Sequence, residues 1–523
     1  MSTPGPTAPF TSVPDLIRAR SRERPEATAI VCGSHRASYA ELDALSDRIA
    51  AALQRDGIGQ SDIVAICASS SVAYVAAFLG AVRIGVVVAP LPPTTTAESL
   101  AAMVHDGPAK LLFADSSTAA LVRNAGLADL CISLDAGRGN LDTWLRADTL
   151  RPRPVVIEPQ WPFNIIYSSG TTGTPKGIVQ THERRAAAVA RREQMGYRAD
   201  AVTLLATPLY SNTTLVALFP TLAGGGTAVL MPKFDSRRYL ELAQQERATH
   251  TMLVPVQYQR ILAEPGFDGF DLGSFRMKFC AGAPFSAERK REVLERWPGG
   301  LIEIYGTTEG GGSCMLEAHR HPDKLHTVGR PTAGSEFCVI DDMGQPLPPG
   351  QSGEIAGRSA TMMDAYHGQS GSGELNWFDA QGRRFLRSGD IGYFDSDGFL
   401  VLVDRKKDMI ISGGFNIYPS DLESQLRRHP HVLEAAVVGV PSDRWGETPV
   451  AFVVPRAEAP ADAQEIMLWC NEQVGRTQRL AALQLVADFP RSPVGKVLKR
   501  ELRAAYLAAA PDPPTGVATR QPA

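Results

Sequence analysis

The sequence predicts an α/β fold with a large N-terminal domain of parallel-rich βαβ sheets, a small β subdomain and a small C-terminal α+β domain. From residue 15 to about residue 400, short apolar runs typical of buried strands alternate with helical patterns, and repeated βαβ units form largely parallel sheets covered by helices. The chain has 523 residues, whereas a single core stops growing near about 250 to 300 residues. We therefore expect more than one domain.

The elements of the large domain follow from the spacing of apolar residues. Helical patterns cover residues 15–24, 38–54 and 184–195. Strand-like runs cover residues 111–114, 163–167, 177–180, 203–207, 227–231 and 251–255.

Residues 63–82 contain no charged side chain, over a length that could span a bilayer. The serines at 69–71 interrupt this stretch and divide it into a strand-like run, 63–67, and a helical run, 72–82, before a second strand-like run at 85–90. Strands covered on both faces have unbroken apolar sequences. A buried βαβ unit is therefore predicted, and no membrane span.

The sequence changes around residues 344–357, where Pro and Gly accompany short strands and predict a small antiparallel β subdomain that extends to about residue 403. The charged run 404–408 follows, and we place the end of the large domain at residue 404. Residues 405–523 form the predicted C-terminal domain, with a disordered tail from about residue 511. Its predicted helices are 418–428 and 463–474, and its predicted strands are 435–440 and 450–454.

Composition excludes several classes of protein. A formal net charge of −3 gives no reason to expect nucleic acid or an anionic membrane as the main partner. The seven cysteines are scattered without a Cys-x-x-Cys pair, which favours reduced thiols over disulfides or zinc. The first residues lack the basic segment and apolar core of a signal peptide. We expect a cytoplasmic protein. If it binds an anion, a local site and not the overall charge must hold that anion.

A glycine- and hydroxyl-rich loop between two apolar runs suits a polyphosphate. Its glycines allow backbone N–H groups to turn toward an anion, its hydroxyls donate hydrogen bonds, and Lys176 adds charge. The spacing is not that of a Walker A loop, because Pro175 stands five residues after Gly170. A flexible linker is the alternative, and the apolar flanks argue against it. The candidate phosphate-binding residues are Ser168, Ser169, Gly170, Thr171, Thr172, Gly173 and Lys176.

The run 167–182 resembles the signature loop of the adenylate-forming acyl-activating superfamily, which includes acyl-CoA synthetases, adenylation domains of peptide synthetases and the beetle luciferases. Further segments match in order, from about Asp15 to Leu507. The resemblance implies two half-reactions: a carboxylate and ATP give acyl-AMP and pyrophosphate, and the thiol of coenzyme A then takes the acyl group. It also implies Mg²⁺ as the activating ion. Positioning and charge neutralisation carry most of such catalysis.

Residues 303–309, Glu-Ile-Tyr-Gly-Thr-Thr-Glu, resemble the second nucleotide motif of this superfamily. The resemblance implies that Tyr305 packs on adenine, Thr308 bonds the α-phosphate and Glu309 holds Mg²⁺, and these side chains suit those partners. Thr308 and Glu309 are thus candidate catalytic residues. The same motif adds Glu303 and Gly306 to the candidate nucleotide site.

Two further motifs complete the resemblance. Residues 388–390 resemble the ribose motif, in which Asp390 accepts hydrogen bonds from the sugar, and Arg405 is expected to contact ribose or phosphate. The segment 490–500 resembles the catalytic-lysine motif, which implies that Lys496 bridges the carboxylate and the α-phosphate. We favour Lys496 over Lys499 as the catalytic group.

The resemblance also implies a mobile C-terminal domain. Lys407 occupies the hinge position, and rotation there removes Lys496 from the reacting groups. The same rotation brings Ser412, Gly413 and Gly414 to border a narrow tunnel for the pantetheine arm of coenzyme A. The basic residues Arg184, Arg185, Arg191 and Arg192 either meet the 3′-phosphate of coenzyme A or form a solvated helix face, and we favour the solvated face.

The resemblance places the acyl pocket at three segments, with Ser211 where many aryl-CoA relatives have histidine. Residues 209–214 contain no aspartate to pair with a substrate ammonium, so we expect an acid without an α-amino group. The glycines 310–312 leave room for a ring or a branched group. The candidate pocket residues are Tyr210, Ser211, Gly282, Ala283, Pro284, Gly310 and Gly311.

The predicted function is a ligase that joins an aromatic or alicyclic acid to coenzyme A. The alternatives are a medium-chain fatty acid–CoA ligase, an acyl-AMP ligase that loads a carrier protein, and, from a different class, a non-catalytic nucleotide-binding regulator. Acyl-CoA ligases are often monomers or dimers, so a homodimer is one expected state.

Overall fold

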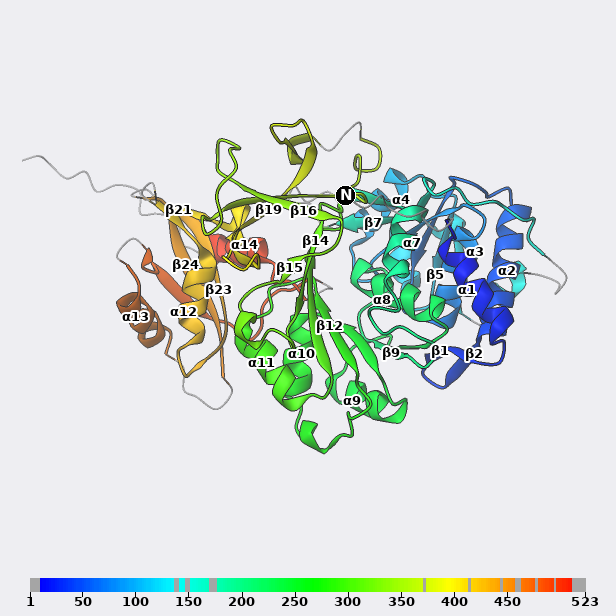
Figure 1. Cartoon of the computed structure of the whole chain (residues 1–523), viewed down its shortest axis with the longest axis horizontal. Helices are drawn as coiled ribbons and strands as arrows, with labels where there is room; N and C mark the ends of the chain where they lie inside the picture. The colour runs from blue at the N-terminus through cyan, green and yellow to red at the C-terminus, as the bar shows by residue number, and fades with distance from the viewer. Residues whose placement is uncertain are drawn as a thin grey trace, which may run out of the picture. The chain divides into compact units, whose positions relative to one another are not determined.

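The computed structural model describes residues 10–135, 141–145, 151–168, 176–369, 373–412, 415–442, 445–456, 462–475, 478–492 and 495–509. It divides into two compact units (Figure 1). Unit 1 comprises Met1–Cys338, Ala356–Ser388 and Ser396–Val401, and unit 2 comprises Val339–Ile355, Gly389–Asp395 and Leu402–Ala523. The single boundary expected after residue 404 stays a prediction. Two stretches before that position, Val339–Ile355 and Gly389–Asp395, group with the C-terminal residues in unit 2.

A nine-stranded sheet in unit 1 has the order β15-β14-β13-β12-β11-β9-β10-β1-β2. Its central strands, from β13 to β1, pair in parallel, and the pairings at both edges are antiparallel. The strands are β1 (Thr28–Cys32), β2 (His35–Ser38), β9 (Val202–Leu205), β10 (Thr227–Leu230), β11 (His250–Leu253), β12 (Met277–Ala281), β13 (Gly300–Gly306), β14 (Ser313–Glu317) and β15 (Arg330–Pro331).

A six-stranded sheet, with the order β6-β5-β3-β4-β7-β8, completes the parallel-rich part of unit 1. Its strands are β3 (Ile63–Cys67), β4 (Val87–Pro90), β5 (Leu111–Ala114), β6 (Cys131–Ser133), β7 (Pro162–Ser168) and β8 (Lys176–Thr181). The uncharged stretch forms β3, helix α3 (Val72–Val82) and β4, and β3 pairs in parallel with β4. The buried βαβ prediction is therefore confirmed.

Helices between and outside the two sheets form the core. One apolar cluster joins a face of each sheet to helices that lie between them, α1 (Val13–Glu23), α2 (Tyr39–Arg55), α3 and α8 (Asn212–Ala223). The outer face of the nine-stranded sheet packs against α9 (Ser236–Gln245), α10 (Pro255–Leu262) and α11 (Ala287–Arg296). The outer face of the six-stranded sheet packs against α4 (Ala97–Asp106) and α5 (Ala119–Asn124).

Local sequence sets the helix ends. Ser38 and Glu41 cap each other at the start of α2, because the Ser38 hydroxyl accepts from the Glu41 N–H and the Glu41 carboxylate accepts from the Ser38 N–H. Helix α7 (His182–Ala190) is shorter than the predicted 184–195. The prediction of its end was wrong because residues 191–196 form turns that close on Gly196, whose φ of +83° reverses the chain.

The predicted small β subdomain is a five-stranded sheet in which β16-β17-β19-β18 follow one another and β20 pairs with β19. Four strands of this sheet, β16, β17, β19 and β20, have residues in both units. The strands are β16 (Ser335–Ile340), β17 (Gly353–Ser359), β18 (Asn376–Phe378), β19 (Arg384–Phe394) and β20 (Leu400–Arg405).

The remainder of unit 2 is α+β, as predicted. Its sheet has the order β22-β21-β24-β23, with β25 paired to β24. Helices α12 (Pro419–Arg427) and α13 (Ala463–Gln473) cover one face, and α14 (Lys499–Ala509) covers the other. The strands are β21 (Ile410–Ser412), β22 (Phe415–Ile417), β23 (Val432–Ser442), β24 (Gly446–Pro455) and β25 (Ala482–Leu485).

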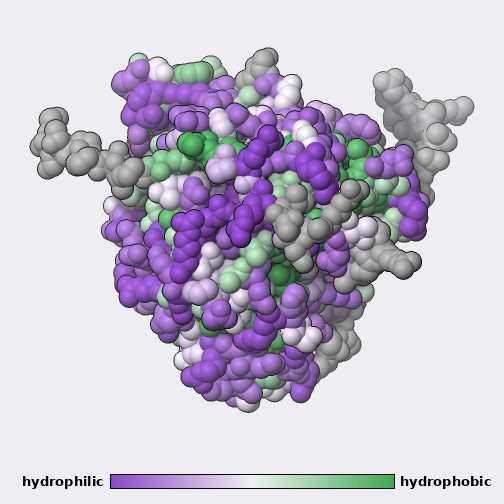
Figure 2. All heavy atoms as spheres, turned by 90° about the vertical axis from the view of Figure 1, so that its right-hand side faces the viewer, coloured by the Kyte–Doolittle hydropathy of each residue, from purple (hydrophilic) through white to green (hydrophobic). Residues whose placement is uncertain are grey.

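Two observations concern the surface. None of the described helices is both long enough and apolar enough to cross a membrane. Hydrophilic residues dominate the face shown in Figure 2, where hydrophobic residues form small separate groups.

Candidate active site

The phosphate loop connects two antiparallel strands of the six-stranded sheet, in the register Tyr167 to Gly177 and Ser168 to Lys176. Ser168 ends β7, and Lys176 begins β8 in a half-buried position. The loop between them lies outside the described residues. It contains the predicted ligands Ser169, Gly170, Thr171, Thr172 and Gly173.

The second nucleotide motif lies beside the strand that leaves this loop. Tyr305 and Gly306 end β13, and Thr308 and Glu309 follow in the turn toward β14. The Gln180 side-chain amide, on β8, donates to the Thr308 carbonyl at 2.8 Å. The fold therefore brings together two motifs that are more than a hundred residues apart in sequence.

Tyr366 joins these two motifs, and the sequence analysis missed it. Its phenol donates to Oε1 of Glu309 at 3.2 Å, and the Lys176 Nζ lies 5.0 Å from the centroid of its ring. A single tyrosine in a loop gives no sequence signal. Its significance comes only from contacts with residues far along the chain.

Glu303 has a structural role in unit 1. Its side chain on β13 is buried and forms an ion pair with Lys290 on α11. Lys290 also donates to the carbonyls of Leu325 and Thr327, at 2.8 and 2.9 Å. Burial raises the pKa of the Glu303 carboxyl, and Lys290 opposes that rise. The expected contact between Glu303 and the nucleotide stays a prediction.

The predicted ribose and lysine motifs meet within unit 2. Arg405 Nε lies 2.9 Å from Oδ1 of Asp390. Burial, together with the positive charges of Arg405 and Lys407, lowers the pKa of the nearby Lys496 ammonium to about 8. Three cationic side chains therefore lie near the Asp390 and Asp408 carboxylates, which gives a group that suits a nucleotide phosphate.

Asp404 supports this group. Its carboxylate accepts from the Arg405 N–H at 2.6 Å and from the Ser420 N–H at 2.8 Å, at the start of α12. Asp404 thereby fixes the backbone of Arg405 against the helix. The sequence analysis placed this residue only within a charged run.

The other predicted residues of unit 2 fall in different environments. Lys499 forms a 2.7 Å ion pair with Glu423, which supports the preference for Lys496 as the catalytic lysine. Lys407 is exposed on a short 3₁₀ turn between β20 and β21, and Ser412 is buried at the end of β21. Gly413 and Gly414 lie outside the described residues.

The candidate acyl-pocket residues come from three loops of unit 1. Tyr210 and Ser211 precede α8, and Ser211 is buried. Gly282, with a φ of +92°, begins the turn that continues through Ala283 and Pro284 after β12. These three segments follow β9, β12 and β13 of one sheet, where the carboxyl ends of parallel strands meet.

The glycines after Glu309 are explained by packing of the chain on itself. A Cβ at Gly310 would stand 2.3 Å from the Thr361 carbonyl oxygen, and its φ is +83°. A Cβ at Gly311 would stand 3.1 Å from the Gly357 carbonyl oxygen, and one at Gly312 would stand 3.0 Å from the Phe337 ring. These contacts explain why the three positions are glycine. The expectation that they leave room for an acyl group stays a prediction.

The solvated face expected for the four arginines is wrong for Arg185. Its side chain is buried, donates to Asn164 Oδ1 at 2.9 Å and donates to Asn212 Oδ1 at 2.8 Å. Burial, with a smaller effect of the neighbouring Arg184 charge, lowers the pKa of this guanidinium to about 9. Arg185 thus links β7, α7 and the start of α8, next to two candidate pocket residues.

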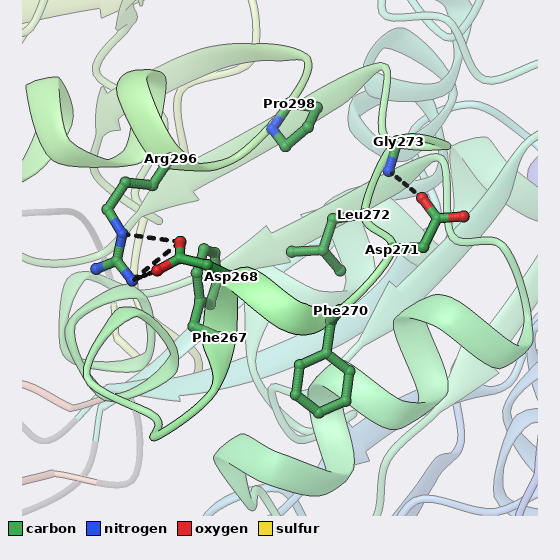
Figure 3. A pocket seen from close by; sticks show the side chains of 8 residues that line it. All are labelled: Phe267, Asp268, Phe270, Asp271, Leu272, Gly273, Arg296 and Pro298. Carbon is green, nitrogen blue, oxygen red and sulfur yellow. Dashed lines mark hydrogen bonds and ion pairs between the residues drawn. The ribbon is translucent and has the colours of Figure 1, made fainter.

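A separate surface depression of about 300 Å³ lies at the end of α11 (Figure 3). Phe270, Leu272 and Pro298 line it, and Arg296 pairs with Asp268 at its edge, at 3.1 Å. The depression contains none of the predicted site residues, so it lies apart from the candidate site.

Comparison with known proteins agrees with this arrangement of motifs. Residues 17–367 match the family described as AMP-binding enzyme, and residues 421–496 match the AMP-binding enzyme C-terminal domain. The chain belongs to the AMP-binding enzyme family. Both domains of this family are therefore present, and the resemblance to the adenylate-forming superfamily is confirmed.

Relatives within the AMP-binding enzyme family match over nearly the whole chain. A feruloyl-CoA synthase from Amycolatopsis sp is 33% identical over 500 residues, which cover 92% of this chain and 97% of the relative. An indoleacetate–CoA ligase from Aromatoleum aromaticum is 33% identical over 505 residues, covering 92% and 95%. A fatty acid–[acyl-carrier-protein] ligase, ScoC, from Streptomyces coeruleorubidus is 30% identical over 494 residues, covering 92% and 94%.

Solved structures of the family share the fold. ATP-bound MatB from Rhodopseudomonas palustris has a TM-score of 0.83 at 28% identity and covers 95% of this chain and 99% of its own. The o-succinylbenzoate CoA synthetase MenE from Bacillus subtilis, in complex with its acyl-adenylate, has a TM-score of 0.82 at 27% identity, covering 94% and 99%.

The residues around Glu309 fit the magnesium ion that accompanies ATP in this family. The Glu309 carboxylate is half-buried and uses one oxygen for Tyr366, and a carboxylate oxygen is a hard ligand that suits Mg²⁺. The described residues contain no group of three or more side chains that could hold a metal alone.

Proposed function

We propose that the protein is an ATP-dependent carboxylic acid–CoA ligase, which forms acyl-AMP and pyrophosphate and then acyl-CoA and AMP. The observation that supports it most directly is the convergence of Lys176 and Glu309 on Tyr366. A cation for the terminal phosphates and a magnesium ligand then lie side by side, as adenylation requires.

We assign each candidate residue a defined part of the chemistry. Bound Mg²⁺ would supply neutralising charge on the phosphates. Lys176 binds the pyrophosphate end of ATP, the Thr308 hydroxyl donates to the α-phosphate, and Asp390 accepts from the ribose hydroxyls. The Lys496 ammonium holds the carboxylate against the α-phosphorus, because two anions must approach each other there.

We propose an aromatic or alicyclic acid as the substrate, with a medium-chain fatty acid as the alternative. Feruloyl-CoA synthase and indoleacetate–CoA ligase, both named for aromatic acids, support the first choice. The absence of aspartate from residues 209–214 disfavours amino acids, since an unpaired ammonium is costly to bury.

Acid-dependent exchange between ATP and pyrophosphate tests the first half-reaction. Purified protein with Mg²⁺ and a panel of aromatic, alicyclic, aliphatic and amino acids should exchange label with aromatic or alicyclic acids above the others. Exchange that is independent of any acid, or absent throughout the panel, would contradict the proposal and favour a nucleotide-binding regulator.

A second candidate function is an acyl-AMP ligase that loads a carrier protein, which the relative ScoC favours. Mass spectrometry of reactions that contain either coenzyme A or a phosphopantetheinylated carrier separates the two. Acyl-CoA as the product supports the main proposal, and thioester found only on the carrier sinks it. A homodimer in the cytoplasm is also proposed, and sedimentation velocity measures the oligomeric state.

A further inference from the structure

A short segment of unit 1, residues 359–367, is fastened to both nucleotide motifs. On one side, the Met363 N–H donates to the Glu309 carbonyl at 2.8 Å, and the Ser359 hydroxyl donates to the Gly310 carbonyl at 2.7 Å. On the other side, the His367 N–H donates to the Gly177 carbonyl at 2.8 Å. The segment therefore connects the turn that carries Glu309 to the strand that begins with Lys176.

Close backbone contacts fix this segment at both ends. A Cβ at Gly177 would stand 3.0 Å from the His367 Cβ and 2.9 Å from Ile165, and one at Gly310 would stand 2.3 Å from the Thr361 carbonyl oxygen. Neither glycine can carry a side chain without moving the segment. Its position relative to the two motifs is thus set within narrow limits.

Tyr366 is the side chain of this segment that faces the site. Tyr366 is 9% exposed as a residue and packs in a cluster with Ile178, Met363 and Leu386, while its backbone forms a β-bridge to Ile178. Apolar packing therefore holds the ring in place. The hydroxyl extends from the ring to the Glu309 carboxylate.

Tyr366 contacts two charged side chains, Glu309 through its hydroxyl and Lys176 through its ring. Its phenol donates to Oε1 of Glu309, and among the described residues no hydrogen bond is made to the other oxygen of that carboxylate. The Lys176 ammonium lies near the ring, which attracts a cation.

We propose that Tyr366 is a positioning residue for both charged ligands of the ATP phosphates. Its hydroxyl orients the Glu309 carboxylate so that the second oxygen is presented to Mg²⁺, and its ring holds the Lys176 ammonium beside the same phosphates. This inference rests on the proposed function, because it assigns Mg²⁺ to Glu309 and pyrophosphate to Lys176.

Tyr366→Phe tests the hydroxyl alone. The ring remains, so the contact with Lys176 and the apolar packing are kept. We expect the Mg²⁺ concentration for half-maximal ATP–pyrophosphate exchange to rise about tenfold, as for other groups that orient a metal ligand. The KM for ATP at saturating Mg²⁺ should stay near the wild-type value, and excess Mg²⁺ should restore the rate.

Tyr366→Leu removes the ring as well. We expect the same shift in Mg²⁺ dependence and, in addition, a several-fold rise in the KM for ATP at saturating Mg²⁺, because the Lys176 ammonium is no longer held. Isothermal titration of ATP without the acid provides a readout apart from turnover: the dependence of the ATP Kd on Mg²⁺ should shift in Tyr366→Phe.

Tyr258→Phe is the matched control. The Tyr258 phenol is buried in α10 and donates to the Phe279 carbonyl at 2.8 Å, so this variant loses a comparable hydrogen bond away from the nucleotide motifs. A wild-type Mg²⁺ dependence in Tyr366→Phe would overturn the inference, and so would an equal shift in Tyr258→Phe. If the wild type itself shows neither acid-dependent exchange nor Mg²⁺-dependent ATP binding, the proposed function fails together with it.

Discussion

At the scale of single residues, Lys496 is the side chain on which the proposed first half-reaction depends most. It shares unit 2 with Asp390 and Arg405, whereas Lys499 is committed to Glu423. Lys496→Ala should lower the rate of adenylation by on the order of a hundredfold or more, because a transition-state charge partner is lost. A preformed acyl-AMP should still be converted to thioester, which a single-turnover assay with coenzyme A measures. Equal loss of both half-reactions would contradict a role for Lys496 in adenylation alone.

The protonation of the same lysine predicts a pH dependence. Burial, with the charges of Arg405 and Lys407, brings the pKa of Lys496 from its usual 10.5 to about 8. Only the protonated form carries the charge that adenylation needs. The kcat/KM for ATP, which reports on the free enzyme, should therefore fall as pH rises through about 8. In Lys496→Arg the remaining activity should lack this fall, because arginine stays protonated; a persistent fall would assign it to another group.

Sequence motifs identified candidate residues that the fold brings together, but they did not show what surrounds those residues. Asp390 and Arg405 were chosen from motifs, and the fold pairs them. Tyr366 escaped because its role depends on Glu309, 57 positions earlier, and on Lys176. Arg185 was read as solvated because α7 carries several charges, whereas its buried partners, Asn164 and Asn212, come from other elements.

At the scale of elements, strands and helices followed from apolar periodicity wherever the pattern was unbroken. The segments β3, α3 and β4 match their predicted ranges closely because all three are buried and their sequences are uniformly apolar. The end of α7 was missed because a turn that depends on Gly196 competes with continued helix. Apolar periodicity therefore predicts buried strands and helices well, but it predicts the turns that end them less well.

The ion pair between α11 and β13 is a testable link between elements. Lys290 and Glu303 are both buried, so removing one partner leaves the other charge without compensation. Lys290→Met should lower the free energy of unfolding by about 3 to 5 kcal/mol, and Lys290→Met combined with Glu303→Leu should recover most of the loss. Urea unfolding followed by fluorescence measures both. A double variant no more stable than the single one would count against this account.

At the scale of the whole molecule, each of the two units is built from three separate stretches that alternate along the chain. Lys406 contacts Glu354 at 3.1 Å and Asp342 at 3.2 Å, and Arg405 contacts Asp390, all within unit 2. In unit 2, carboxylates that precede position 404 in the sequence therefore pair with cationic side chains that follow it. A sequence pattern cannot show this, because it reports order along the chain and not grouping in space.

This alternation predicts the behaviour of a truncated protein. A fragment of residues 1–404 keeps Glu354 and Asp390 but loses Lys406 and Arg405, so the nearly buried Glu354 carboxylate has lost its ammonium partner. An uncompensated buried carboxylate costs about 1 to 3 kcal/mol or more. The fragment should be cleaved around residues 339–355 and 389–395 by a low dose of protease that leaves the full chain intact. Equal resistance of fragment and full chain would support a simple boundary at 404.

The glycines at 310–312 also limit how this enzyme could be re-engineered. Because the Thr361 carbonyl, the Gly357 carbonyl and the Phe337 ring occupy the directions in which side chains would extend, a side chain at any of the three positions would displace one of these groups, and a side chain at Gly310 would move the segment that holds Tyr366. Directed evolution toward other acids should therefore keep these three positions fixed. If the predicted acyl pocket is correct, variation is better placed at Tyr210, Ser211 and Ala283, which lie on loops after other strands of the sheet.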